Sequence, residues 1–204
     1  MPRRRHGASS RTGRVQRGAY VDPSPMSRAA SRMNNDLRYR DGAHANQRQL
    51  TPPYVLEPVR VALGGVIGLD PCNEPDNPTG AIRFYTAEHD GLRQSWDDDS
   101  IYVNPPYSRA REPWVKKCVQ AGVGSRVVLL MPAATDTRIF QWAMTDAHEV
   151  VFIKGRVKFG VLRSNRRQEA ASHPSALLGW NVSMAPCAHL GLRATAMLAQ
   201  PKLY

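Results

Sequence analysis

The chain has 204 residues, of which 42% are apolar, and a formal net charge of +11, so it can form one globular domain with a sizeable core and a tail. It contains no apolar run near the ~20 residues that a membrane helix needs, and its basic N-terminus lacks the apolar segment of a secretory signal. We therefore expect a soluble, cytoplasmic protein.

The positive charge is concentrated at the N-terminus. Residues 1–48 contain eleven Arg and three Asp, a net of +8, whereas the rest contains 17 Lys and Arg and 14 Asp and Glu, a net of +3. We expect 1–48 to be a largely disordered basic tail and 49–204 to be a single domain. The tail either binds phosphate backbones through counterion release or is a solvated extension.

The cysteines argue against a metal centre. Cys72, Cys118 and Cys187 are far apart, there is no CxxC pair, and no histidine lies at metal-ligand spacing. We expect no metal site and three free thiols, which suit a reducing compartment.

The expected elements alternate between helices and strands. Thr51 is expected to cap a first helix that has Pro52 at its first position and is interrupted or kinked at Pro58. We then expect strands at 66–69, 82–85, 101–103, 126–131, 150–153, 156–161 and 175–182, and helices at 112–120 and 137–144. The alternation predicts an α/β fold with a mostly parallel sheet, and the closely spaced last strands predict an antiparallel hairpin at its C-terminal edge.

The segment Asn104-Pro105-Pro106-Tyr107 directly follows one of these strands. An exocyclic amino group such as N6 of adenine is a poor nucleophile because its lone pair is delocalised into the ring. The Asn104 amide oxygen and the Pro105 carbonyl can accept its hydrogens, and the prolines hold these acceptors rigidly. The Tyr107 ring can stack on a base taken out of the duplex. The alternative is a proline-rich turn closed by a surface tyrosine.

Two aspartates follow other expected strands. Asp70, in Leu69-Asp70-Pro71-Cys72, is placed to contact the amino-acid part or the ribose of a nucleoside-like cofactor. Asp90, before Gly91, is placed to accept a hydrogen bond from an adenine amino group. Each can equally be an ordinary turn residue.

Basic and apolar residues alternate around Gly155. We expect Val157 and Phe159 to pack inward, while basic side chains face nucleic-acid phosphates. With the loop that follows, this basic set is Lys154, Arg156, Lys158, Arg163, Arg166 and Arg167. An ordinary amphipathic hairpin and a solvated loop are the alternatives.

The motifs together resemble the phage-type DNA N6-adenine methyltransferases. The matching motifs, in order, are Thr51-Pro52-Pro53, Leu69-Asp70-Pro71-Cys72, Asp90-Gly91-Leu92, Asn104-Pro105-Pro106-Tyr107-Ser108, Trp114, Leu130-Met131-Pro132, the hairpin at 155–159 and the strand at 174–177. The resemblance extends from Thr51 to about Trp180 and covers most of the globular part.

The resemblance implies a Rossmann-like methyltransferase sheet and the cofactor S-adenosylmethionine. Thr51 and Pro52 would lie by the methionine end of the cofactor, Asp70 and Cys72 beneath it, and Asp90 by its adenine. Asn104, Pro105, Pro106 and Tyr107 would hold the target base, with Ser108 beside the DNA. Two departures stand out: no glycine occurs between Asp70 and Gly80, and the interval from Asp70 to Tyr102 is so short that one helix must be reduced or missing.

We therefore expect a phage-borne methyltransferase that modifies N6 of adenine in double-stranded DNA, without a metal, and protects that DNA from restriction. The alternatives are methylation of another planar amino group, namely cytosine N4, an RNA adenine or a protein glutamine, and a DNA-binding relative without catalytic activity.

Overall fold

The computed structural model describes residues 49–106, 111–161 and 168–195. The expected basic tail at 1–48 lies outside the described residues. So do five of the expected site residues, namely Tyr107, Ser108, Arg163, Arg166 and Arg167.

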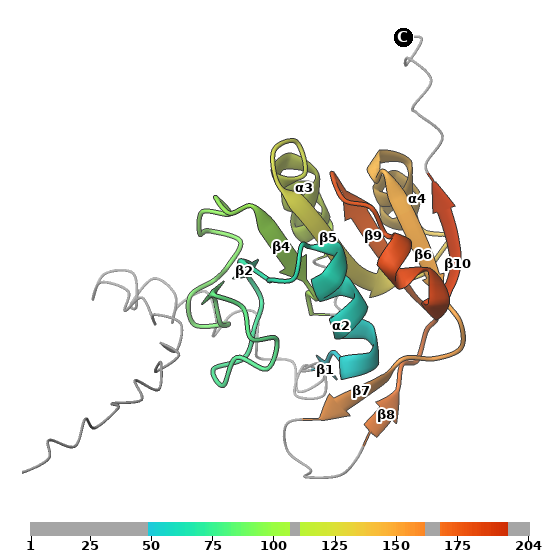
Figure 1. Ribbon diagram of the computed structural model, residues 1–204, viewed down its shortest axis with the longest axis horizontal. Helices are drawn as coiled ribbons and strands as arrows, with labels where there is room; N and C mark the ends of the chain where they lie inside the picture. The colour runs from blue at the N-terminus through green and yellow to red at the C-terminus, as the bar shows by residue number, and fades with distance from the viewer. Residues whose placement is uncertain (1–48, 107–110, 162–167, 196–204) are drawn as a thin grey trace, which may run out of the picture.

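A mixed seven-stranded sheet forms the centre of the fold (Figure 1). Its strand order is β10-β6-β9-β5-β4-β2-β3. The strands are β2 (Leu69–Asp70), β3 (Arg83–Phe84), β4 (Ser100–Val103), β5 (Arg126–Pro132), β6 (Glu149–Ile153), β9 (Ser175–Trp180) and β10 (Gly191–Thr195). The pairs β3–β2, β2–β4 and β4–β5 are parallel. The predicted α/β class is therefore confirmed, but the sheet is parallel only at this end, because the β10–β6, β6–β9 and β9–β5 pairs are antiparallel.

The antiparallel strands do not form the expected edge hairpin. Strand β9 is inserted between β5 and β6 and is antiparallel to both. The edge beyond β6 is formed by β10, which the sequence did not predict. The expected hairpin instead lies in a second sheet, where β7 (Lys158–Val161) pairs with both β1 (Gln49–Leu50) and β8 (Gln168–Ala170). Because the last strands are closely spaced along the chain, they were expected to be neighbours in one sheet. Strand β7 instead leaves the main sheet and pairs with β1, which directly precedes Thr51.

Helices cover both faces of the main sheet. Figure 1 shows α2 (Pro53–Ala62) and the 3-10 helix η3 (Ala185–Leu190) on one face, and α3 (Glu112–Ala121) and α4 (Arg138–Asp146) on the other. Residues 71–99, all of them described, contain no helix between β2 and β4. This confirms the loss of a helix that the short interval predicts.

The first helix departs from its prediction at two points. Its N-cap is Pro52, with no side-chain cap hydrogen bond, and Pro53 is the first helical residue. Pro58 lies inside the helix without ending it. Packing of Val55 and Val59, both fully buried, stabilises the helix despite the hydrogen bond that Pro58 cannot donate.

The core consists of two apolar clusters separated by the sheet. Along β5, Val128 and Leu130 belong to the cluster under α2 and η3, and Val127, Leu129 and Met131 belong to the cluster under α3 and α4. This alternation follows from the two-residue period of a strand. Because both faces are covered, β5 reads as one continuous apolar run.

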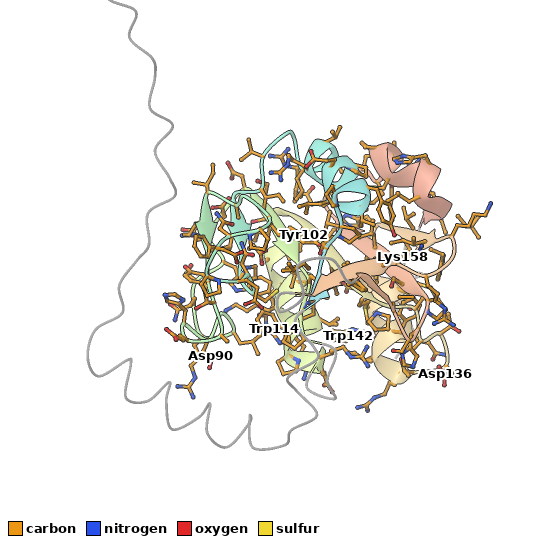
Figure 2. All side chains as sticks on the ribbon, turned by 90° about the horizontal axis from the view of Figure 1, so that it is seen from below. Asp90, Tyr102, Trp114, Asp136, Trp142 and Lys158 are labelled. Atoms are coloured by element: carbon orange, nitrogen blue, oxygen red, sulfur yellow. The ribbon has the colours of Figure 1, made fainter. Side chains whose placement is uncertain are left out.

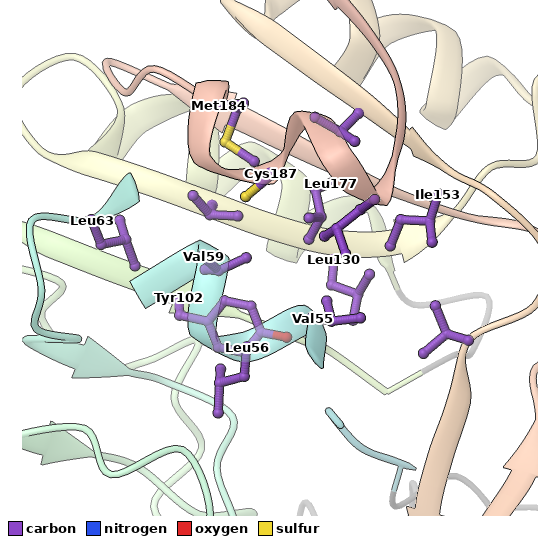
Figure 3. Packing of buried hydrophobic residues seen from close by; sticks show 14 of the residues in the cluster. Val55, Leu56, Val59, Leu63, Tyr102, Leu130, Ile153, Leu177, Met184 and Cys187 are labelled. Carbon is purple, nitrogen blue, oxygen red and sulfur yellow. The ribbon is translucent and has the colours of Figure 1, made fainter. Parts of the chain in front are cut away.

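The cluster under α2 contains one large polar side chain. Figure 3 shows Tyr102 of β4 among the apolar residues of this cluster, which include Val55, Leu56 and Val59. Tyr102 is fully buried. A buried tyrosine hydroxyl needs a hydrogen-bond partner, so its partner becomes important at the site described below.

Within the described ranges, no helix has the length and apolar character needed to cross a membrane. The three cysteines, all in described segments, form no disulfide.

Candidate active site

Asp70 and Asn104, two of the expected site residues, lie at one edge of the main sheet. Because β2, β4 and β5 are parallel, their carboxyl ends meet at the same edge. Asp70 ends β2 and Asn104 directly follows β4. Figure 2 views the molecule from this end, with Asp90 and Lys158 labelled on opposite sides of Tyr102. In open α/β sheets this edge is where ligands bind.

The Asn104 amide is held by a residue from the start of the described chain. Its Nδ2 donates to the Thr51 hydroxyl at 3.1 Å, and the same hydroxyl lies 2.7 Å from the Tyr102 hydroxyl. The sequence predicts a helix-capping role for Thr51, and this is wrong, because the capping position is occupied by Pro52. The Thr51 side chain instead joins the entry of α2 to the end of β4.

The two prolines after Asn104 differ in exposure. Pro105 is buried and Pro106 is exposed. A buried proline with a fixed φ limits how far the Asn104 backbone can move. This arrangement agrees with a rigid loop.

The Asp70 carboxyl is buried and fully engaged in hydrogen bonds. It is 3% exposed, and its two oxygens accept from the Cys72 backbone N–H at 3.1 Å and from the Thr79 hydroxyl at 2.9 Å. Burial raises the pKa of Asp70 to about 7, although these hydrogen bonds act in the opposite direction. Asp70 therefore shapes the loop that follows β2, and the sequence did not identify Thr79 as its partner.

Asparagine side chains organise the loop that lacks a glycine before Gly80. Asn73 Nδ2 donates to Asn77 Oδ1 at 2.6 Å and to the Thr79 hydroxyl at 2.9 Å. Asn77 has a positive φ of 50°, a conformation that asparagine tolerates better than most residues. Its Oδ1 also accepts from the Ala81 N–H at 3.1 Å. This network gives the loop its shape without glycine.

Cys72 connects the Asp70 segment with Asn104. Burial is the largest cause that raises the pKa of the Cys72 thiol well above its ordinary value, while a hydrogen bond with the Asn104 backbone lowers it. The thiol is therefore protonated at neutral pH. Cys72 is a neutral contact between the two expected binding segments and not a nucleophile.

Asp90 lies in a tight turn packed on the Asp70 segment. It has a φ of 51° and pairs with Arg93 at 3.3 Å. A Cβ on Gly91 would lie 1.8 Å from the Pro71 carbonyl oxygen. Only glycine allows the two backbones to approach so closely, so the expected cofactor residues on these two loops belong to adjoining segments.

Lys117 of α3 fixes the Asp90 turn from outside, a role that the sequence did not reveal. Its Nζ donates to the Leu92 carbonyl at 2.8 Å and lies 5.1 Å from the Trp96 ring centroid. Partial burial is the main cause that lowers the pKa of Lys117, and Asp90 partly opposes it. The sequence did contain a signal for this role: Lys117 lies on the otherwise apolar side of the expected helix, four residues before Ala121.

Residues 154–159 do not form a hairpin of their own but lead from β6 into the β7–β8 hairpin, and they have the alternation that the sequence predicts. Lys154, Arg156 and Lys158 are exposed, whereas Val157 and Phe159 are buried. Strand β7 is tied to the Asn104 side of the edge, because Gly160 pairs with Leu50, the residue before Thr51.

An open groove of about 560 Å³ lies between the N-terminal ends of α3 and α4, at the same edge. Glu112 forms ion pairs there with Lys116 at 2.9 Å and with Arg138 at 3.9 Å. None of the residues that line the groove was expected to be a site residue; they are Arg111, Glu112, Lys116, Thr137, Arg138, Ile139 and Trp142.

Comparison with known proteins identifies the family. The model of the family described as DNA N-6-adenine-methyltransferase (Dam) matches residues 44–198, which include every described residue. A DNA N-6-adenine-methyltransferase of Escherichia phage T1 is 32% identical over 74 residues, covering 35% of this chain and 31% of that protein. The chain thus matches about a third of the length of this relative. Because the family match covers most of the sequence, the chain belongs to the DNA N-6-adenine-methyltransferase (Dam) family.

Proposed function

We propose that this chain transfers a methyl group from S-adenosylmethionine to N6 of adenine in double-stranded DNA. The observation that carries the proposal is the Asn104 amide, which ends a parallel strand and is fixed by Thr51 at 3.1 Å. Family membership and the phage T1 relative support adenine in DNA as the substrate. By the same analogy we propose a phage-borne enzyme, acting in the host cytoplasm, that protects phage DNA from restriction.

The proposed fold is a Rossmann-like methyltransferase sheet. The support is the set of strands β3, β2, β4 and β5 running in one direction, with β6 also antiparallel to β9 and therefore parallel to β5. Such a sheet binds its ligands at the carboxyl edge, where the site residues lie.

The residues at the edge fit S-adenosylmethionine. The fit rests on the contact of the Gly91 backbone with Pro71 and of Cys72 with Asn104, which brings three candidate binding segments together. We propose that Asp70 and Cys72 form the floor beneath the cofactor and that Asp90 faces its adenine. When bound at this edge, S-adenosylmethionine would supply an electrophilic methyl group from its sulfonium.

The target amino group would be held by acceptors that are already in place. We propose that the Asn104 amide oxygen and the Pro105 carbonyl accept the hydrogens of N6, which increases the nucleophilicity of the nitrogen. Acceptors fixed before the reaction need no reorganisation at the transition state. Tyr107 is proposed to stack on the extruded base, and Ser108 to contact the DNA.

The exposed hairpin is the proposed DNA-binding element. Lys154, Arg156 and Lys158 are solvent-exposed and can each contact a phosphate. Arg163, Arg166 and Arg167 follow this hairpin in the sequence and extend the same proposal.

The proposal is tested by methyl transfer to unmethylated DNA with labelled S-adenosylmethionine, followed by nucleoside analysis. We expect label in N6-methyladenine, and Asn104→Ala should lower kcat by about 10²- to 10³-fold while cofactor affinity is retained. RNA, protein and cytosine-only DNA substrates run in parallel. Label in N4-methylcytosine, RNA or glutamine, or DNA binding without any transfer, would replace the proposal with the corresponding alternative.

A further inference from the structure

Thr51 and Tyr102 form a buried hydrogen-bonded connection behind Asn104. Tyr102 and Asn104 are two residues apart along β4 and its extension, so their side chains leave the same face of the strand. The Tyr102 ring is fully buried, and its hydroxyl lies 2.7 Å from the Thr51 hydroxyl. Because the surrounding side chains are apolar, the Tyr102 hydroxyl has few alternative hydrogen-bond partners, and its contact with Thr51 holds it in place.

The Thr51 hydroxyl joins both side chains. A threonine hydroxyl has one donor and two acceptor positions, and here it accepts the Asn104 Nδ2–H at 3.1 Å while also bonding Tyr102. Since the N-cap of α2 is Pro52 with no side-chain cap bond, the helix does not use this hydroxyl. Thr51 is half-buried, and both contacts are partly buried.

In this structure the donor end of the Asn104 amide faces the Thr51 hydroxyl, so the acceptor end faces away from it. An asparagine amide has a donor end and an acceptor end, and a rotation by half a turn exchanges them. The donor end of Asn104 is bonded to Thr51. The acceptor end is the one that catalysis requires, because a substrate amino group must donate its hydrogens.

We propose that Thr51 and Tyr102 are positioning residues that hold the Asn104 amide with its oxygen directed to the amino group being methylated. The inference rests on the proposed function, and it gives Thr51 a task other than binding the methionine end of the cofactor. Tyr102 is proposed to act through its contact with the Thr51 hydroxyl.

The two roles of Thr51 predict different kinetics. A positioning role lowers kcat and leaves the dissociation constant of S-adenosylmethionine unchanged, because the lost interaction acts in the transition state. A cofactor-binding role raises that dissociation constant.

The experiment compares Thr51→Val, Thr51→Ser and Tyr102→Phe in single-turnover methylation of DNA, with S-adenosylmethionine affinity measured by calorimetry. We expect Thr51→Val and Tyr102→Phe to lower the methyl-transfer rate at least tenfold and to leave cofactor affinity within about twofold. Thr51→Ser keeps the hydroxyl and should retain most of the methyl-transfer rate. In the double variant Thr51→Val/Tyr102→Phe the two losses in methyl-transfer rate should not add, because both substitutions act through the Asn104 amide.

Two results would overturn the inference. One is an unchanged methyl-transfer rate in Thr51→Val; the other is a weakened cofactor affinity in this variant with the rate at saturation retained. Asn104→Ala is run beside these variants. If Asn104→Ala also keeps its rate, the proposed function fails as well; if Asn104→Ala is inactive and Thr51→Val is not, only the positioning role fails.

Discussion

The two sides of the carboxyl edge are held in place by different kinds of contact. After β2, Asp70 bonds the Cys72 N–H two residues away and Thr79 nine residues away. After β4, Asn104 is bonded to Thr51, 53 residues earlier in the chain. The first side is a loop whose polar groups satisfy one another, and the second depends on packing of α2 against the sheet. Changes on the first side should therefore mainly alter folding and cofactor affinity, and changes on the second should mainly alter catalysis and DNA binding.

The largest effect on stability is expected at Asp70. The pKa of Asp70 is about 7 in the folded protein, against an ordinary value of 3.8. Between these two pH values the folded protein keeps the Asp70 proton, whereas the unfolded chain has lost it. Stability from this group is therefore fully present below about pH 4 and falls as the pH rises towards 7, by up to roughly 4 kcal/mol. Urea unfolding between pH 4 and pH 8 measures this slope, which Asp70→Asn should flatten.

The matched control for Asp70 is Asp136→Asn, which changes an exposed carboxylate before α4. It should keep the pH dependence of the unmodified protein. Equal slopes in Asp70→Asn and the unmodified protein would show that the Asp70 carboxyl is not the origin of the dependence.

A smaller effect is expected at the contact between the Asp70 loop and the Asp90 turn, the two segments proposed to bind the cofactor. In Gly91→Ala the new Cβ would lie 1.8 Å from the Pro71 carbonyl oxygen, so the backbone must move. We expect a loss of about 3 kcal/mol in the free energy of unfolding and weaker binding of S-adenosylmethionine, measured by urea unfolding and calorimetry. Gly124→Ala is the control, because a Cβ there meets no atom within 4 Å. Equal behaviour of the two variants would contradict this packing.

The smallest effect is expected at Lys158, on the side proposed to bind DNA. Lys158 is exposed on β7, so Lys158→Ala should leave folding and cofactor binding within about 0.5 kcal/mol. If Lys158 contacts one phosphate, the slope of log K for DNA against log salt should fall by about 0.9. The charge-conserving variant Lys158→Arg serves as the control. An unchanged slope in Lys158→Ala would identify the hairpin as an ordinary amphipathic one.

The predictions from sequence were best where a pattern repeats locally. The apolar run of β5 and the alternation of Lys158 with buried Val157 and Phe159 follow from the two-residue period of strands, and both are confirmed. The loss of a helix after Asp70 followed from counting residues. These features depend on neighbours in the sequence, so the sequence contains the information needed.

The errors occurred where distant segments compete for the same residue. Threonine is a residue type that often caps helices, yet the Thr51 hydroxyl bonds Tyr102 and Asn104. Pro58 was expected to interrupt or kink the first helix; the interruption is wrong, because α2 continues through Pro58, where Val55 and Val59 are buried. In both cases tertiary contacts outweighed a local preference.

By itself, the sequence determined the alternation of helices and strands and the placement of Asn104-Pro105-Pro106 at the end of a strand, because periodicity and motif order are local properties. Only the tertiary structure decided that β9 is inserted between β5 and β6, that Lys117 bonds the Asp90 turn, and that Thr51 accepts a hydrogen bond from Asn104. Each of these joins residues that are remote along the chain, and their pairing is set by the free energy of packing the whole sheet.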